Sequence, residues 1–346
     1  MNPLFWRDRR VLLTGATGLL GSHLARKLTE LGAEVVALSR DQNLFAAPKR
    51  SDANRPQGGR EPSGASAQMQ QMRASVVFGD CRDGALLRRV LSDYEVDTVF
   101  HLAAQTLVGP ANLDPTTTFE TNIAGTWRLL EACRFLPHVR QIVFASSDNA
   151  YGQQKQFPYA ETAPLQGSQP YAVSKSCADL IAQTYAKTYG LPVSISRCGN
   201  FYGPGDLNWN RIVPGTIRSV LRGQRPLIRS DGRALRDYLY IQDALAAHLL
   251  LAQEMATRRE LCGQAFNFGG GAPLSVVELV RAILKACRRE DLQPEVRGEA
   301  QNEITNQSLD THKARQTLGW KPRWSVEEGL KETVDWYRER LGFPPH

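Results

Sequence analysis

The segment TGATGLLG, residues 14–21, decides the fold and is called the glycine turn below. The apolar run Val11–Thr14 before it is typical of a buried strand. Leucines recur with helical spacing after it, up to Gly32, and predict an amphipathic helix. A helix N-terminus offers unpaired backbone N–H groups and a positive dipole end, and glycines let a pyrophosphate approach that backbone closely. The pattern therefore predicts a dinucleotide-binding turn.

The alternation of strand and helix continues beyond the glycine turn. Further strands are expected at Glu34–Leu38, Ser75–Gly79, Thr98–Ala103, Gln141–Ala145 and Pro192–Cys198, with helices at Gly84–Ser92, Thr116–Phe135 and Tyr171–Tyr189. Such alternation predicts βαβ units, a parallel sheet and helices on both of its faces.

Composition along the chain predicts two parts. Residues 1–199 form the expected nucleotide-binding domain, to which 236–256 return. Residues 200–235 and 257–346 have shorter elements and form a smaller substrate-binding domain. The segment 41–73 is rich in Gly, Pro, Ser and Gln without apolar periodicity, which predicts a disordered insertion.

The overall composition limits the class of protein. The net charge is +7 without any long Lys/Arg run, so we expect no nucleic acid. The charge fits a basic solvated surface, and it would also favour a pyrophosphate-bearing ligand. The six cysteines form no C-x-x-C pair, and no histidine–carboxylate cluster suggests a metal. No apolar run approaches the roughly 18 residues of a membrane span, so we expect no membrane partner. Scattered single cysteines suit a reducing cytosol, so we expect a cytoplasmic protein. His101 at a strand end is expected to be packed or hydrogen-bonded rather than catalytic.

Residues after the second and third strands bear on the choice of dinucleotide. Ser39 stands where a carboxylate would bind the ribose hydroxyls of NAD, and Arg40 could pair with the 2′-phosphate of NADP. Asp41 could instead turn inward and bind ribose. Asp80 is positioned to accept a hydrogen bond from the adenine amino group. NAD and NADP therefore both stay open.

Tyr171 and Lys175 open the helix that follows the fifth strand, and their spacing puts both side chains on one face. A phenol is a poor base at its ordinary pKa of about 10. A neighbouring ammonium and a nicotinium ring favour the phenolate, which can take a hydroxyl proton while hydride leaves carbon. The segment SSDNAYG at 146–152 adds hydroxyl and carboxyl groups at the carboxyl edge of the sheet, where ligands bind.

Segments spread over nearly the whole chain resemble the extended short-chain dehydrogenases/reductases of the nucleotide-sugar epimerase and dehydratase group, most closely the CDP-glucose 4,6-dehydratases. They are TGATGLLG at 14–21, HLAAQ at 101–105, TFETNIAGT at 118–126, SSDNAYG at 146–152, PYAVSK at 170–175, RCGNFYGPGD at 197–206, RDYLYIQD at 236–243 and LDTHKARQTLGWKP at 309–322. The resemblance implies a Rossmann-type doubly wound parallel sheet with a smaller C-terminal α/β substrate-binding domain.

The resemblance also implies roles for residues. Tyr171 would be the base, Lys175 its electrostatic partner, and Ser147 and Asp148 further catalytic groups. A tightly bound, recycled NAD or NADP would contact these two helix residues and Gly15, Thr17, Gly18, Leu19, Gly21, Ser39, Arg40, Asp80, Cys81, Leu102, Ala103, Ala104 and Asn122. A nucleotide-diphosphate sugar would contact Thr106, Ser147, Asn149, Asn200, Arg236 and Arg297. A homodimer would form through a four-helix bundle of the helices near Thr116–Phe135 and Tyr171–Tyr189.

The chain departs from the dehydratase pattern at one position. Dehydratases that resemble it carry Glu or Lys after the aspartate, whereas Asn149 follows Asp148 here, and asparagine accepts no proton near neutral pH. One interpretation is a 4,6-dehydratase with another base, such as Glu161 or the phenolate. A second is a nucleotide-sugar 4-epimerase, which needs no such base. A third is a binding protein for NAD(P) and nucleotide sugar with little turnover. The nucleotide and the sugar stay open.

Overall fold

The computed structural model describes residues 2–40, 74–299 and 304–344. The expected insertion at 41–73, with Asp41, lies outside these residues. Within the described part, the main sheet has seven strands in the order β11-β6-β5-β4-β1-β2-β3. Every strand pair of this sheet whose register is defined is parallel. The chain winds outward from β1 to β3 and then outward again from β4, which confirms the predicted doubly wound α/β fold.

The elements have the following bounds. The strands of the main sheet are β1 (Arg10–Thr14), β2 (Glu34–Ser39), β3 (Ala74–Phe78), β4 (Thr98–His101), β5 (Gln141–Ala145), β6 (Val193–Cys198) and β11 (Ala265–Phe268). Small sheets pair β7 (Asn200–Tyr202) with β10 (Tyr238–Tyr240), β9 (Leu235–Arg236) with β12 (Leu274–Ser275) and β8 (Leu227–Ile228) with β13 (Glu295–Val296). The α-helices are α1 (Leu19–Glu30), α3 (Gly84–Asp93), α4 (Val108–Leu113), α5 (Pro115–Phe119), α6 (Gly125–Arg134), α7 (Pro170–Tyr189), α8 (Ile212–Leu221), α9 (Ile241–Met255), α10 (Val276–Ala286), α11 (His312–Leu318) and α12 (Val326–Leu341). Shorter helical segments are η1 (Pro3–Phe5), η3 (Glu120–Ala124), η4 (Asp148–Tyr151) and η5 (Arg259–Leu261).

The chain divides into two compact units. Unit 1 comprises residues 1–145, 177–194 and 252–264, and unit 2 comprises residues 146–176, 195–251 and 265–346. None of the described helices is long and apolar enough to cross a bilayer. Within the same residues, no group of three or more His, Cys, Asp or Glu side chains could hold a metal ion.

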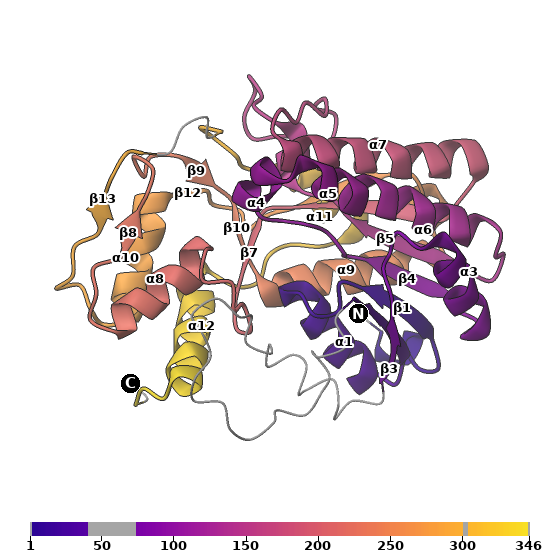
Figure 1. Cartoon of the computed structure of the whole chain (residues 1–346), viewed down its shortest axis with the longest axis horizontal. Coiled ribbons are helices and arrows are strands. Elements are labelled where there is room, and N and C mark those ends of the chain that lie inside the picture. Colours follow the sequence, from indigo (N-terminus) through magenta and orange to yellow (C-terminus); the bar gives the residue numbers. More distant parts are fainter. Residues whose placement is uncertain (1, 41–73, 300–303, 345–346) are drawn as a thin grey trace. The chain divides into compact units, whose positions relative to one another are not determined.

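Unit 1 has its core around β1. Val11, Leu12 and Leu13 are fully buried, as expected of a parallel strand that is covered on both faces. Their register places Leu12 beside Val36 of β2 and Val99 of β4. Helices α3 and α6 lie side by side in this unit (Figure 1). The apolar run that predicted the first strand therefore forms the centre of the sheet.

Unit 2 contains a bundle of α8, α10 and α12, which pack against one another (Figure 1). Both α10 and α12 begin with a capping box, Ser275 with Glu278 and Ser325 with Glu328. In each box the serine hydroxyl and the glutamate carboxylate satisfy backbone amides that the helix leaves unpaired. These local signals fix where the two helices begin.

Candidate active site

The glycine turn in unit 1 requires glycine for steric reasons. Gly15 has a φ of +74°, and a Cβ there would lie 2.8 Å from the backbone nitrogen of Ala103. A Cβ on Gly21 would collide with the carbonyl oxygen of Gly15. Helix α1 begins after Gly18, which makes no side-chain capping bond. The first turn of α1 therefore has no side-chain cap for its backbone amides, which is the arrangement at a helix N-terminus that can bind an anion.

Thr14, at the end of β1, joins the glycine turn to the segment after β4. Its Oγ1 accepts hydrogen bonds from the backbone N–H groups of Leu102 and Ala103, at 3.2 Å each. The same hydroxyl lies 2.8 Å from Nδ1 of His101. Leu102 and Ala103, which the resemblance assigned to the cofactor, are thus held by Thr14, a residue that it did not assign to the site.

His101 continues this chain of hydrogen bonds on its other side. Its Nε2 lies 3.1 Å from Oγ1 of Thr126, and that hydroxyl donates its proton to the carbonyl oxygen of Asn122 at 2.7 Å. Because the Thr126 proton is already used, we infer that Nε2 of His101 carries a hydrogen and that Nδ1 accepts one from Thr14. The expectation of a hydrogen-bonded histidine agrees with these contacts.

Asn122 lies where the helix expected at Thr116–Phe135 is interrupted. The structure has α5, the π-helical segment η3 and then α6 in place of one continuous α-helix. The Asn122 side chain accepts a hydrogen bond from the backbone N–H of Gln105 at 2.7 Å and donates one to its carbonyl oxygen at 2.9 Å. A π-helical turn inserts an extra residue, and such turns are frequent at functional sites. Here the turn carries the side chain that fixes the HLAAQ segment.

Asp80 follows β3 and is engaged by its neighbour. Its carboxylate accepts hydrogen bonds from the backbone N–H, Nε and Nη2 of Arg82, at 2.8 to 3.1 Å. Burial alone would raise the pKa of Asp80, but the hydrogen bonds and charge of Arg82 lower it below its usual value, and Arg40 adds to that effect. Arg40 and Asp80, both assigned to the cofactor from sequence, therefore share one electrostatic environment.

Unit 2 holds the Ser147 cluster, which consists of Ser147, Asp148 and Asn149. Ser147 caps η4, and its Oγ accepts a hydrogen bond from the backbone N–H of Asn149. The Ser147 hydroxyl and the Asn149 amide both donate to Oδ1 of Asp148, at 3.0 Å each. The other carboxyl oxygen, Oδ2, is buried and has no hydrogen-bond partner among the described residues.

Burial raises the pKa of Asp148 to about 6. The hydrogen bond from Ser147 acts in the opposite direction, Asp237 raises the pKa further, and Arg236 lowers it. A carboxyl group with such a pKa exchanges a proton near neutral pH, which an ordinary aspartate does not.

Tyr171 and Lys175 lie one helical turn apart at the start of α7, and both are buried. Burial raises the pKa of Tyr171 to about 12, a hydrogen bond with Ser147 and the charge of Arg211 lower it, and Asp148 raises it. Lys175 acts on Cys198, whose pKa is raised by burial and lowered in part by that ammonium. The structure thus brings Tyr171 to the Ser147 cluster.

The other residues assigned to the sugar nucleotide occupy separate places. Asn200 is exposed on β7, and Arg236 on β9 acts electrostatically on Asp148. Arg297 follows β13 and pairs with Glu295 at 2.9 Å on the surface of unit 2. Thr106 is exposed in unit 1, directly after the HLAAQ segment.

Glu161, the alternative base suggested by the sequence, is tied to β11. Its Oε1 accepts a hydrogen bond from the backbone N–H of Asn267 at 2.8 Å. Burial raises its pKa, whereas that hydrogen bond and Lys313 lower it. The backbone carbonyl of the same residue accepts a hydrogen bond from Arg197 at 3.2 Å. These contacts give Glu161 a structural task at the edge strand.

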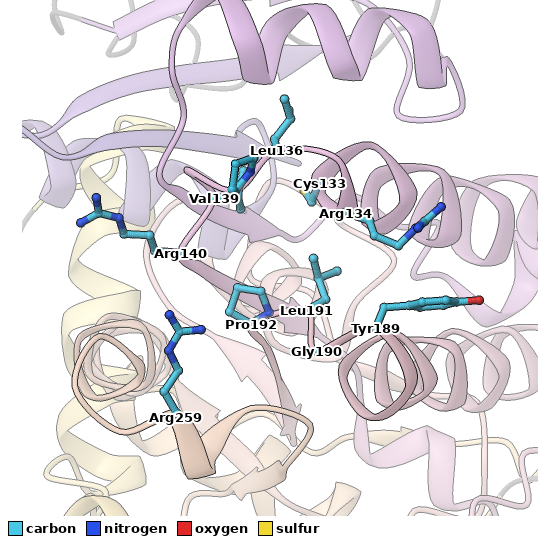
Figure 2. A pocket seen from close by; sticks show the side chains of 11 residues that line it. Cys133, Arg134, Leu136, Val139, Arg140, Tyr189, Gly190, Leu191, Pro192 and Arg259 are labelled. Carbon is cyan, nitrogen blue, oxygen red and sulfur yellow. The ribbon is translucent and has the colours of Figure 1, made fainter.

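A separate pocket of about 210 Å³ lies in unit 1, before the amino ends of β5 and β6 (Figure 2). Arg134 lies in its wall, with its guanidinium carbon 5.0 Å from the centroid of the Tyr189 ring. Its Nη2 forms a salt bridge with Oε1 of Glu131 at 2.6 Å. Cys133, which also lines the pocket, is buried, and that burial raises the pKa of its thiol. The pocket contains none of the residues assigned from sequence to cofactor or substrate.

Comparisons with known proteins agree with this architecture. The family described as GDP-mannose 4,6 dehydratase matches residues 12–333. CDP-glucose 4,6-dehydratase from Salmonella typhimurium is 29% identical over 350 residues, with 96% of this chain and 92% of the relative covered. The structure of dTDP-glucose 4,6-dehydratase from Streptomyces venezuelae, which has NAD bound, is similar with a TM-score of 0.81 and 30% identity, covering 96% of this chain and 98% of that chain. UDP-glucose 4-epimerase from Thermotoga maritima gives a TM-score of 0.80 and 28% identity, covering 96% and 99%.

Proposed function

This chain belongs to the GDP-mannose 4,6 dehydratase family of extended short-chain dehydrogenases/reductases, and on that premise we propose that it is an NAD(P)-dependent nucleotide-sugar 4,6-dehydratase. The observation that carries the proposal is the Ser147 cluster, in which one serine contacts both Tyr171 and the carboxyl of Asp148. A 4-epimerase needs the tyrosine and the serine but has no use for a buried carboxyl that titrates near neutral pH. The relatives that match the chain over most of its length and are named 4,6-dehydratases support the same choice.

The proposed cofactor is NAD or NADP. The glycine turn suits a pyrophosphate, because Gly15 and Gly21 stand where a Cβ would collide with backbone, so glycine allows this tight turn to form before the helix N-terminus. Leu102, Ala103 and Asn122 would contact the cofactor from the segments that Thr14 and His101 fix, and Asp80 or Arg40 would meet the adenosine end. When bound, the nicotinamide supplies a hydride acceptor for C4 of the sugar and a hydride donor for C6.

Tyr171 is proposed as the base that takes the proton of the sugar 4-hydroxyl. Its pKa of about 12 means that burial alone leaves it protonated at neutral pH. Positive charge beside it favours the phenolate, and Lys175, one turn along α7, is the proposed source from this chain. Ser147 would hydrogen-bond the same sugar hydroxyl and orient it towards Tyr171.

The substrate is proposed to be a nucleotide-diphosphate hexose. Asn200 and Arg236 would hold its diphosphate, Arg297 would assist, and Thr106 with Asn149 would contact the sugar. We also propose that residues 200–235 and 257–346 form the substrate-binding part. A homodimer through α5, α6 and α7 is proposed because Trp127 and Leu180 on these helices are 40% and 52% exposed.

Incubation with CDP-, dTDP-, GDP- and UDP-hexoses tests the proposed function. The expected product of one of them is lighter by one water, as seen by mass spectrometry. A product of equal mass with a changed C4 proton coupling in the NMR spectrum would identify an epimerase instead. If no sugar reduces the bound cofactor even transiently, the proposal fails. Denaturing the purified protein and identifying the released dinucleotide distinguishes NAD from NADP.

A further inference from the structure

The two carboxyl oxygens of Asp148 have unlike surroundings. Oδ1 accepts hydrogen bonds from the Ser147 hydroxyl and from the Asn149 amide, at 3.0 Å each. Oδ2 is buried and has no hydrogen-bond partner in the described part of the chain. Two donors stabilise negative charge on Oδ1, so a proton on this carboxyl group resides on Oδ2.

Two other carboxylates of unit 2, those of Asp237 and Glu161, accept hydrogen bonds from backbone N–H groups. Asp237 is fully buried and accepts hydrogen bonds from the N–H groups of Gly270 and Leu309. Glu161 accepts one from the N–H of Asn267. Asn149 cannot accept a proton. Asp148 is the carboxyl group of the cluster, and its Oδ2 makes no hydrogen bond among the described residues.

We propose that Asp148 alone moves both protons of the elimination and that Asn149 is a positioning residue that keeps Oδ2 as the oxygen that carries them. The proposal rests on the proposed function, which supplies a 4-keto sugar. Oδ2 of the carboxylate takes the C5 proton, and the electrons of that C–H bond form an enolate with the C4 carbonyl. Oδ2 then gives the proton to the C6 hydroxyl, the C6–O bond breaks as the C5–C6 double bond forms, and water leaves. The carboxylate is restored, so no second acid or base is required.

The surroundings of Asp148 suit a group that must both accept and donate. Burial is the main cause that raises its pKa to about 6. Asp237 raises it further and Arg236 lowers it, while Tyr159, Tyr171 and Cys198 are the titratable neighbours that Asp148 affects in turn. At neutral pH the group is mainly a carboxylate and can begin as the base, yet it holds a proton more strongly than an ordinary aspartate.

The pH dependence of elimination distinguishes one shuttling carboxyl group from two separate groups. In single turnovers of the wild-type protein with a sugar already oxidised at C4, we expect the rate of water loss to rise through one ionisation near pH 6 and to stay level above it. If Asp148 were only the acid for the leaving hydroxyl, the rate would fall as the pH rises through the same pKa. A falling rate overturns the proposal.

Asp148→Asn with a substrate deuterated at C5 provides the second test. We expect the bound cofactor still to be reduced, while loss of C5 deuterium and loss of water both slow by about 10²–10⁴-fold. Continued loss of C5 deuterium without loss of water would mean that another base acts, and it would overturn the proposal. Glu161→Gln is the matched control, since the amide oxygen can still accept from Asn267, and we expect it to retain both reactions. Arrested deuterium loss in Glu161→Gln likewise contradicts the proposal.

Cofactor reduction in the variant and in the wild-type protein separates failure of the shuttle from failure of the proposed function. If Asp148→Asn fails to reduce the cofactor, the wild-type pH profile decides. If the wild-type protein itself reduces no cofactor with any sugar, the proposed function fails, and this result is distinct from failure of the shuttle.

Asn149→Ala tests the positioning role. Loss of a donor to Oδ1 raises the pKa of Asp148, so the midpoint of the pH profile should move to higher pH. An unchanged midpoint would show that Asn149 has no such role.

Discussion

The glycine turn of unit 1 and the Ser147 cluster of unit 2 prepare for a ligand in different ways. In the turn, backbone sterics decide the outcome, because a Cβ on Gly15 or Gly21 would meet the backbone of the same unit. In the cluster, burial and side-chain hydrogen bonds decide, because they raise the pKa of Asp148 and Tyr171 and direct two donors to one oxygen. The shape of the turn therefore follows from its residue types, whereas the reactivity of the cluster depends on the groups that surround it.

Tyr171→Phe should abolish the chemistry at the Ser147 cluster and leave dinucleotide binding at the glycine turn unchanged. The phenylalanine keeps the ring but cannot take a proton, so we expect turnover to fall by about 10²–10⁴-fold. Dinucleotide binding, measured by fluorescence titration, should stay near the wild-type value. Near-normal turnover would contradict the central role of this phenol.

Asp148→Asn should show how much the buried charge of Asp148 lowers the free energy of unfolding. The folded-state pKa of about 6 lies above the ordinary 3.8, so the stabilising contribution of this group is full below the ordinary value and is lost as the pH rises through about 6. At pH 8 the buried charge costs about 3 kcal/mol, and the uncharged variant avoids that cost.

Urea unfolding at pH 8 and pH 5 measures this effect. We expect Asp148→Asn to be more stable than the wild-type protein at pH 8, with a smaller difference at pH 5. Equal differences at both values would show that Asp148 does not titrate in this range.

Gly21→Ala should weaken dinucleotide binding at the glycine turn and leave the Ser147 cluster unchanged. The added methyl group must displace the carbonyl of Gly15, and such overpacking costs about 1–3 kcal/mol. If the bound state bears this cost, dinucleotide affinity falls by about 5- to 150-fold. Gly84→Ala is the control, because a Cβ there meets nothing within 4 Å. If both variants bind the dinucleotide as the wild-type protein does, the turn is not the pyrophosphate site.

Asn149→Lys should have the smallest effect of these variants on the rate of water loss, and it tests whether Asp148 acts without a second base. An ammonium beside Asp148 lowers the pKa of that carboxyl by about one unit, so the pH profile of water loss should move to lower pH. The plateau rate should change little if Asp148 alone transfers the protons. A large gain in dehydration would mean that Asn149 marks a missing base.

The amino-acid sequence was sufficient to predict the parallel sheet and the position of the glycine turn. Strand and helix alternation predicted a parallel sheet with helices on both faces, and glycine spacing located the turn, because both follow from local preferences. The division of the helix at 116–135 by a π-helical segment depended on Asn122 meeting Gln105, and no local pattern contains that contact. Distant partners also explain why the effect of Arg211 on Tyr171 and the attachment of Glu161 to β11 were missed.

The fate of a sugar deuterated at C5 tests the central claim most directly. The wild-type protein, incubated with nucleotide-diphosphate hexoses that carry this label, should release a 4-keto product that is lighter by one water and has lost the deuterium from C5. A product that keeps the deuterium and the mass of the substrate would contradict the claim, because no proton would then have left C5 and no water would have been eliminated.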